Sequence, residues 1–94
     1  MSTLHHVRLH AVIDGIVQGV GFRQHTLHCA HRLHVTGLVK NRRDRKVELI
    51  AEGTRAELED FLAAVREGPP ASLVRHVDIS WEVANGTFSD FTIE

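Results

Sequence analysis

The apolar residues of this chain follow two different periods, and the order in which the periods alternate limits the folds it can adopt. Strand-like patterns, most clearly a period of two, cover residues 7–14, 35–41, 47–52, 77–83 and 88–93. A period of about 3.6, typical of amphipathic helices, covers residues 22–33 and 54–67. The predicted order is therefore strand, helix, strand, strand, helix, strand, with a short extra strand at the end.

The second predicted helix has the clearest boundaries. Thr54 and Glu57 have the spacing of a capping box, and a Gly-Pro-Pro run that begins at Gly68 stops the helix. Between these ends lies a stripe of apolar residues with helical spacing: Leu58, Phe61, Leu62 and Val65. We expect this stripe to face the core.

This order of elements predicts an α+β fold of the ferredoxin-like split βαβ type. Its pattern is β-α-β-β-α-β plus a short C-terminal strand, with an antiparallel sheet and two helices on one face. Gly15 is expected to end the first strand, residues 42–46 to form a hairpin, and Asn85-Gly86 to form a turn before the last strand. Because this fold serves many unrelated functions, function has to be inferred from particular residues.

Size and composition exclude several classes of protein. The 94 residues suit one domain, residues 1–94, with a core from about residue 7 to 94. Since no apolar stretch approaches the roughly 20 residues of a membrane span and the N-terminus lacks a signal-like pattern, we expect a cytoplasmic protein without a membrane partner. A net charge of -1 argues against nucleic-acid binding, and with Cys29 as the only cysteine no intramolecular disulfide can form.

A glycine-rich segment, residues 15–23, lies between the first predicted strand and the first predicted helix. Free N–H groups and the positive end of the helix dipole favour an anion at such a position. The segment fits neither a P-loop nor a dinucleotide-binding motif, so spacing alone leaves two interpretations open: an anion cradle or a tight reversal of the chain. Arg23 favours the cradle, because a cation in the first helical turn opposes the dipole but suits a phosphate bound there.

The sequence Gly-Ile-Val-Gln-Gly-Val-Gly-Phe-Arg of residues 15–23 resembles the first signature of the acylphosphatase family. The resemblance continues over nearly the whole chain. It includes Gly-Leu-Val-Lys-Asn at residues 37–41, Glu-Gly at 52–53 and Ser-Asp-Phe at 89–91. The resemblance implies an acylphosphatase that acts on a small acyl phosphate, as a monomer, without a metal or other cofactor.

The resemblance also implies roles for particular residues. Arg23 and Asn41 match the catalytic pair, in which the arginine holds the phosphate and the asparagine orients the attacking water. The phosphate is expected to be bound by main-chain N–H groups and the arginine, within the set Gln18, Gly19, Val20, Gly21, Phe22 and Arg23. Without the resemblance, Asn41 would be interpreted as a turn residue at the end of a strand.

The chemistry of an acyl phosphate suits so small a set of groups. Its carboxylate leaves easily, so no strong acid is needed, and phosphoryl transfer depends mainly on positioning and electrostatic stabilisation. The runner-up is a non-catalytic module that binds phosphate or carbamoyl phosphate. A third possibility is a metal-binding or small-ligand regulatory domain of the same fold, which would use the histidines instead of the loop.

Other conspicuous residues have simpler interpretations. Four histidines recur every third residue and are expected on the solvent face of the first helix: His25, His28, His31 and His34. Without nearby carboxylate or thiolate partners, they are a poor metal site. The basic residues after Asn41 are interpreted as a solvated hairpin tip, or else as a source of positive potential near the pocket: Arg42, Arg43, Arg45 and Lys46. Cys29 is expected to be a buried packing residue.

Three residues depart from the family pattern. His34 and Arg45 occupy positions where a glycine is common, and Leu38 replaces a usual aromatic residue. His34 and Arg45 would be strained if the backbone there has a positive φ. These departures concern loop geometry and stability and leave the predicted catalytic pair intact.

Overall fold

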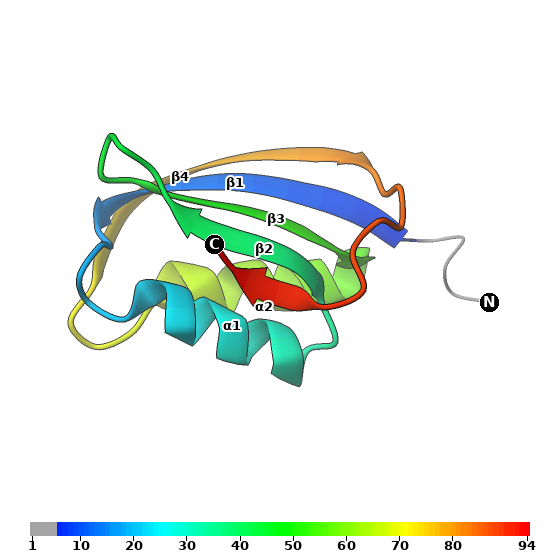
Figure 1. The fold of residues 1–94 in the computed structure, drawn as a ribbon, viewed down its shortest axis with the longest axis horizontal. Helices are drawn as coiled ribbons and strands as arrows, with labels where there is room; N and C mark the ends of the chain where they lie inside the picture. The colour runs from blue at the N-terminus through cyan, green and yellow to red at the C-terminus, as the bar shows by residue number, and fades with distance from the viewer. Residues whose placement is uncertain (1–5) are drawn as a thin grey trace.

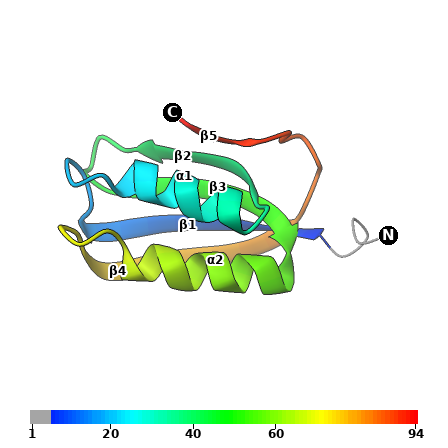
Figure 2. The ribbon, with the colours of Figure 1, turned by 90° about the horizontal axis from the view of Figure 1, so that it is seen from below.

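A computed structural model describes residues 6–94 of the chain (Figure 1). The elements are β1 (His6–Ile16), α1 (Phe22–Arg32), β2 (Thr36–Asn41), β3 (Val47–Thr54), α2 (Arg55–Glu67), β4 (Leu73–Val83) and β5 (Phe91–Ile93). The strands form one sheet in the order β4-β1-β3-β2-β5, and both helices pack against one of its faces (Figures 1 and 2). The predicted ferredoxin-like α+β fold is confirmed.

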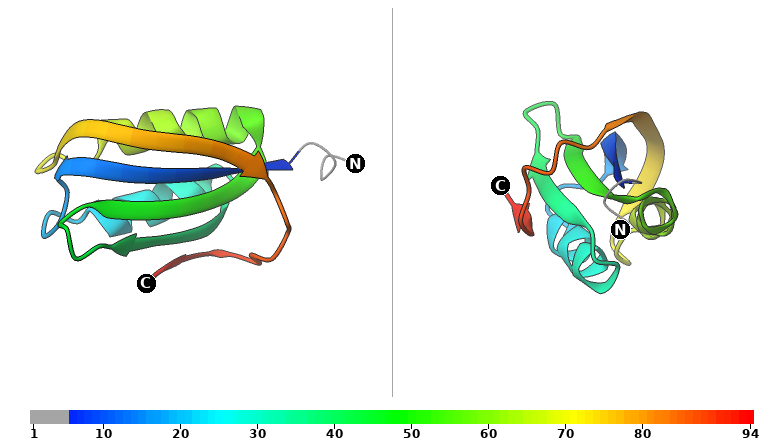
Figure 3. Two further views of the ribbon diagram at one scale, coloured as in Figure 1. Left: turned by 90° about the horizontal axis from the view of Figure 1, so that it is seen from above. Right: turned by 90° about the vertical axis from the view of Figure 1, so that its right-hand side faces the viewer.

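The core lies between the two helices and the sheet. Seen from its end, the molecule has both helices on the same side of the sheet (right panel of Figure 3). The predicted capping box of Thr54 and Glu57 is present, and the predicted apolar stripe of α2 is buried. That stripe packs with alternate residues of β1 and β3: Leu9, Ala11, Ile13, Val47, Leu49 and Ala51. Phe61 of α2 also contacts Phe91 edge to face, with ring centroids 5.8 Å apart.

The first strand does not end at Gly15, as the sequence predicted, but continues to Ile16. Its register against β4 shifts between Asp14 and Gly15. Gly15 has a φ of 141°, and a Cβ atom there would stand 2.0 Å from the carbonyl oxygen of Leu73. Only glycine permits so close an approach of two backbones. The irregularity thus lies at the start of the glycine-rich segment, and β1 stays paired with β4 up to Ile16.

The sheet is mixed, whereas the sequence predicted an antiparallel one. The pairs that β1 makes with β3 and β4, and the pair of β2 with β3, are antiparallel, but β5 pairs with β2 in parallel. After β4 the chain crosses the end of the sheet, reverses its direction and joins the opposite edge (Figure 3, left). The last strand therefore begins at Phe91, later than the expected residue 88, because residues 84–90 make this crossing.

No helix within residues 6–94 is long and apolar enough to cross a membrane. The expected location also depended on the N-terminal segment, of which residues 1–5 lie outside the described part of the chain.

Candidate active site

The glycine-rich loop leads directly into the N-terminus of α1. Gly21 precedes the helix with a φ of 80°, in the left-handed region that favours glycine. Within residues 6–94 no side chain caps this helix start, and its first turn holds no acidic residue. The N–H groups of a first helical turn have no acceptors within the helix, so this terminus offers donors and a positive dipole end to an anion.

A small hollow of about 180 Å³ opens at this helix start. Its walls come from the loop, the first turn of α1, the end of β2 and the end of β5, and consist of Val17, Gly19, Gly21, Phe22, Arg23, Gln24, Asn41 and Ile93. Arg23 is half-buried and Asn41 is exposed. The two residues predicted to be catalytic, which are 18 positions apart in the sequence, thus face the same hollow.

The guanidinium of Arg23 is held by the last residue of the chain. Its Nη1 donates a hydrogen bond of 3.1 Å to the main-chain oxygen of Glu94. Glu94 is in place because its own N–H donates to the carbonyl oxygen of Val39 in β2, at 2.8 Å. Since a guanidinium has five N–H donors, the other donors of Arg23 stay available for an anion. The contact restricts the side chain before any ligand binds.

Asn41 is the last residue of β2 and pairs with Val47 across the hairpin. Directly after it, the N–H of Arg42 donates to the carbonyl oxygen of Lys46, at 2.8 Å, which closes the hairpin. Within residues 6–94 the side-chain amide of Asn41 makes no hydrogen bond with the protein. Its oxygen and nitrogen are therefore available to a water or a ligand in the hollow.

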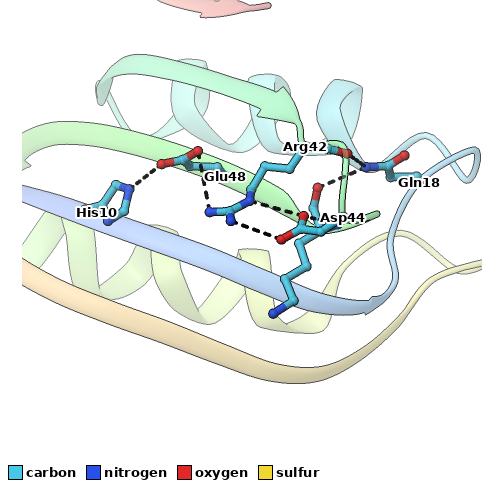
Figure 4. Close-up of polar contacts among 6 residues, drawn as sticks. His10, Gln18, Arg42, Asp44 and Glu48 are labelled. Carbon is cyan, nitrogen blue, oxygen red and sulfur yellow. Dashed lines mark hydrogen bonds and ion pairs between the residues drawn. The ribbon is translucent and has the colours of Figure 1, made fainter.

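Gln18 ties the loop to this hairpin, as Figure 4 shows. Its side-chain nitrogen donates to the carbonyl oxygens of Arg42, at 2.8 Å, and of Lys46, at 3.0 Å. These bonds fix the loop relative to the residue that follows Asn41. Among the predicted phosphate-binding residues, Gly19, Gly21, Phe22 and Arg23 line the hollow, whereas Gln18 and Val20 do not. That the main-chain N–H groups of those two residues donate to a phosphate stays a prediction.

Charged side chains support the hairpin from the open face of the sheet (Figure 4). His10 Nε2 lies 2.6 Å from Glu48 Oε2, and because a carboxylate only accepts, that nitrogen carries the proton. The guanidinium of Arg42 lies 3.8 Å from Glu48 and makes two bonds to Asp44, at 3.0 and 3.2 Å. Arg42 therefore supports the hairpin and is not part of a solvated tip. Arg43 and Arg45 are exposed, as the sequence predicted for the tip.

Two carboxyl groups in this network have shifted pKa values. The hydrogen bond from His10 lowers the pKa of Glu48, and this effect exceeds the opposing effect of partial burial. Desolvation would raise the pKa of Asp44, but its bonds to Arg42 and to the N–H of Lys46 lower it overall. Both groups are therefore anionic at neutral pH and hold Arg42 in place.

The other conspicuous residues lie away from the hollow. Cys29 is buried, as expected. His28, His31 and His34 are exposed, but His25 is half-buried, with its ring 3.4 Å from the carbonyl oxygen of Ala64 in α2. The prediction of four solvent-facing histidines was therefore wrong for His25, because the helix turns this residue toward its neighbour.

The sequence did not identify the parts of the site that come from distant segments. Ile93 lines the hollow and Glu94 holds Arg23, and both depend on the chain crossing the sheet after β4. The side chain of Gln18 acts on carbonyl groups 24 and 28 residues away. No sequence pattern marks such contacts with the main chain.

A family model, similar sequences and a similar solved structure carry the same family name. A family model described as Acylphosphatase matches residues 9–93. A protein of Salinibacter ruber named acylphosphatase is 45% identical over 93 residues, which cover 99% of this chain and 98% of the relative. A protein of the same name from Syntrophotalea carbinolica is 44% identical and is covered over 95% of its length. The crystal structure of acylphosphatase from Bacillus subtilis superposes with a TM-score of 0.91 at 35% identity, covering 94% of this chain and 98% of that one.

Proposed function

Because the chain belongs to the acylphosphatase family, and is therefore a hydrolase of acyl phosphates, we propose that Arg23 and the loop bind the phosphate while Asn41 orients the attacking water. The observation that carries the proposal is the shared hollow, which the loop, Arg23 and Asn41 line together. The activity itself follows from the relatives, and the division of roles is our proposal.

The phosphate is held at the start of α1. Main-chain N–H groups of residues 18–22, together with the free donors of Arg23, surround its oxygens. Arg23 stands in the first turn of α1, where a lone cation opposes the helix dipole, and a bound phosphate dianion compensates that charge. The bond to Glu94 keeps the guanidinium at the rim, so that little side-chain freedom is lost on binding.

Asn41 acts on the water. Its amide oxygen accepts a hydrogen bond from the water and directs the lone pair of the water oxygen at phosphorus. The new P–O bond forms as the bond between phosphorus and the acyl oxygen breaks, and the carboxylate departs without an acid. An amide is not basic enough to take the proton, so the proton passes to a phosphate oxygen or to solvent. Asn41 is therefore expected to raise the rate by positioning.

The proposal is tested by release of phosphate from benzoyl phosphate with a chelator present. The wild type is expected to turn over, and Arg23→Ala is expected to lose both turnover and binding of inorganic phosphate. Arg32→Ala, which removes the same charge from the other end of α1, serves as the matched control and keeps both. Activity that required added metal would contradict the proposal, and phosphate binding without turnover by the wild type would favour a non-catalytic module.

A further inference from the structure

A second hollow lies beside the glycine-rich loop, and the reaction proposed above does not use it. Its volume is about 680 Å³. Its walls are the end of β1, the loop, the hairpin tip and the first part of β4, and consist of Asp14, Gly15, Ile16, Val17, Gln18, Gly19, Asp44, Arg45 and Arg75. It shares Val17 and Gly19 with the first hollow, but Asn41 lines only the first.

Two guanidinium groups of this hollow have no protein partner. Arg45 and Arg75 are exposed and make no side-chain hydrogen bond or ion pair within residues 6–94. Of the two carboxylates in the lining, Asp44 is engaged by Arg42 at 3.0 Å, and only Asp14 is left to offset the two cations. The hollow therefore has an excess of unpaired positive charge that suits an anionic group.

The backbone of Arg45 is strained, and within residues 6–94 its side chain makes no hydrogen bond or ion pair that would explain why a glycine is not found here. The φ of Arg45 is 73°, and its N–H donates to the carbonyl oxygen of Arg42, at 3.3 Å, within the hairpin tip. Glycine is the usual residue at this left-handed position of a hairpin loop, and a residue with a Cβ atom is strained there. A strained residue whose free guanidinium lines a hollow points to a role in binding.

The second hollow adjoins the first one, because Val17 and Gly19 line both. The bond that breaks lies roughly in line with the attacking water, so the acyl group leaves on the side of the phosphate away from Asn41. Gly19 lines both hollows, and apart from its two chain neighbours no atom of residues 6–94 lies within 4 Å of the place where its Cβ would stand. The space above Gly19 is therefore open to an acyl group that extends from one hollow to the other.

We infer that the second hollow binds the acyl part of the substrate, and that Arg45 and Arg75 favour acyl phosphates that carry a second anionic group, such as a carboxylate. The inference rests on the proposed function, because it needs the phosphate to be bound in the loop. It makes the two arginines specificity residues, which contact the substrate but not its reacting atoms.

The test compares acyl phosphates that differ only in charge. The kcat/KM is measured for 3- and 4-carboxybenzoyl phosphate and for the corresponding carboxamides, with the wild type, Arg45→Gly, Arg75→Gln and the double variant. The ratio of acid to amide is expected to fall about threefold in each single variant and about tenfold in the double variant, mainly through KM. Arg45→Gly relieves the backbone strain, so loss of folding does not explain its effect.

Arg43→Gln is the matched control, because it removes a charge from the same hairpin tip at a residue that does not line the hollow. Its ratio is expected to stay within about twofold of the wild-type value. An unchanged ratio in the double variant, or an equal fall in Arg43→Gln, would overturn the inference. Failure of the wild type to hydrolyse benzoyl phosphate would instead contradict the proposed function.

Discussion

At the scale of single residues, Gln18 shows how one side chain positions others. Its amide nitrogen has two protons and uses both on carbonyl oxygens of the hairpin, next to Asn41. The glycine-rich loop and the hairpin that follows Asn41 are thereby joined without a covalent link. A hydrophobic or acidic side chain of similar size does not supply these two donors.

Gln18→Glu is expected to impair turnover more than Gln18→Ala. The glutamate is isosteric but places a carboxylate against two carbonyl oxygens, whereas alanine only removes two bonds, worth about 0.5–1.5 kcal/mol each. We expect kcat on benzoyl phosphate to fall in both variants and KM to rise most in Gln18→Glu, because its charge also repels the phosphate. Steady-state kinetics measure kcat and KM of each variant, and thermal unfolding measures its stability. If kcat and KM stayed at wild-type values while stability fell, Gln18 would have a purely structural role.

The residues of the candidate site differ in how well the sequence alone predicts them. Arg23 could be assigned from its place after a glycine-rich loop at a helix start, because dipole and charge give that position a meaning. Asn41 could be assigned only by resemblance, since an asparagine at a strand end is an ordinary turn residue. Glu94 and the side chain of Gln18 were missed, because main-chain acceptors and long-range contacts leave no pattern in the sequence.

At the scale of elements, α1 has an uncapped start and a tightly closed end. At its C-terminus, Val35 N–H donates to Ala30 O at 2.9 Å and His34 N–H to His31 O at 3.5 Å. These are the two bonds of a Schellman motif, in which the residue at the position of His34 is usually glycine. His34 has a φ of 60°, so the strain that the sequence made conditional on a positive φ is present.

His34→Gly is therefore expected to stabilise the protein. Relief of the left-handed strain is worth about 1 kcal/mol, which corresponds to a rise in Tm of about 4–8 °C for a domain of this size. His28→Gly, in the middle of the same helix, is the control and is expected to lower Tm slightly, because glycine is a poorer helix former than histidine. Thermal unfolding followed by circular dichroism measures both. A lower Tm for His34→Gly would show that the imidazole makes a contact that outweighs the strain.

The elements differ in how well local sequence defines them. Thr54, Glu57 and Gly68 supply local start and stop signals, so α2 could be predicted with its ends. The end of β1 could not, because its bulge depends on the close approach of Gly15 to Leu73 in a strand far along the chain. The direction of β5 likewise could not be predicted. It depends on the chain crossing from β4 at one edge of the sheet to β2 at the other, and no local sequence pattern indicates this crossing.

At the scale of the whole molecule, the chain returns to the site only after it has crossed the sheet. The crossing is held at its start by Glu52, whose carboxylate accepts bonds from the N–H groups of Asn85 and Gly86, both at 3.1 Å, and from Arg8 at 2.8 Å. The side chain of Glu52 is only 3% exposed. One buried carboxylate thus links β1, β3 and the segment that leads to β5, Ile93 and Glu94.

This carboxylate makes stability depend on pH. Burial opposes its ionisation, but the N–H of Asn85, Arg8 and the N–H of Gly86 together lower the pKa of Glu52. Since the pKa is lower in the folded than in the unfolded protein, the unfolded state binds more protons in the acidic range. The stabilising contribution is present above the unfolded pKa of about 4.3 and is lost as the pH falls below it.

Glu52→Gln is expected to reduce the free energy of unfolding at pH 7 by about 1.5–3 kcal/mol, and to flatten its fall between about pH 5 and pH 3. Urea unfolding over a series of pH values measures both effects. Glu59→Gln removes a carboxylate from the exposed pair with Arg55 and is expected to change stability by less than about 1 kcal/mol. Equal slopes for the wild type and Glu52→Gln below pH 5 would contradict this account of Glu52.

If Arg23 and the loop bind phosphate while Asn41 positions water, as we propose, Asn41→Ala separates the two functions. The measurement pairs kcat on benzoyl phosphate with the Kd of inorganic phosphate by calorimetry, in the wild type and in this variant. We predict that kcat falls about 100- to 1000-fold while Kd changes by less than about twofold. A near-wild-type kcat, or a loss of phosphate binding equal to the loss of turnover, would contradict the account.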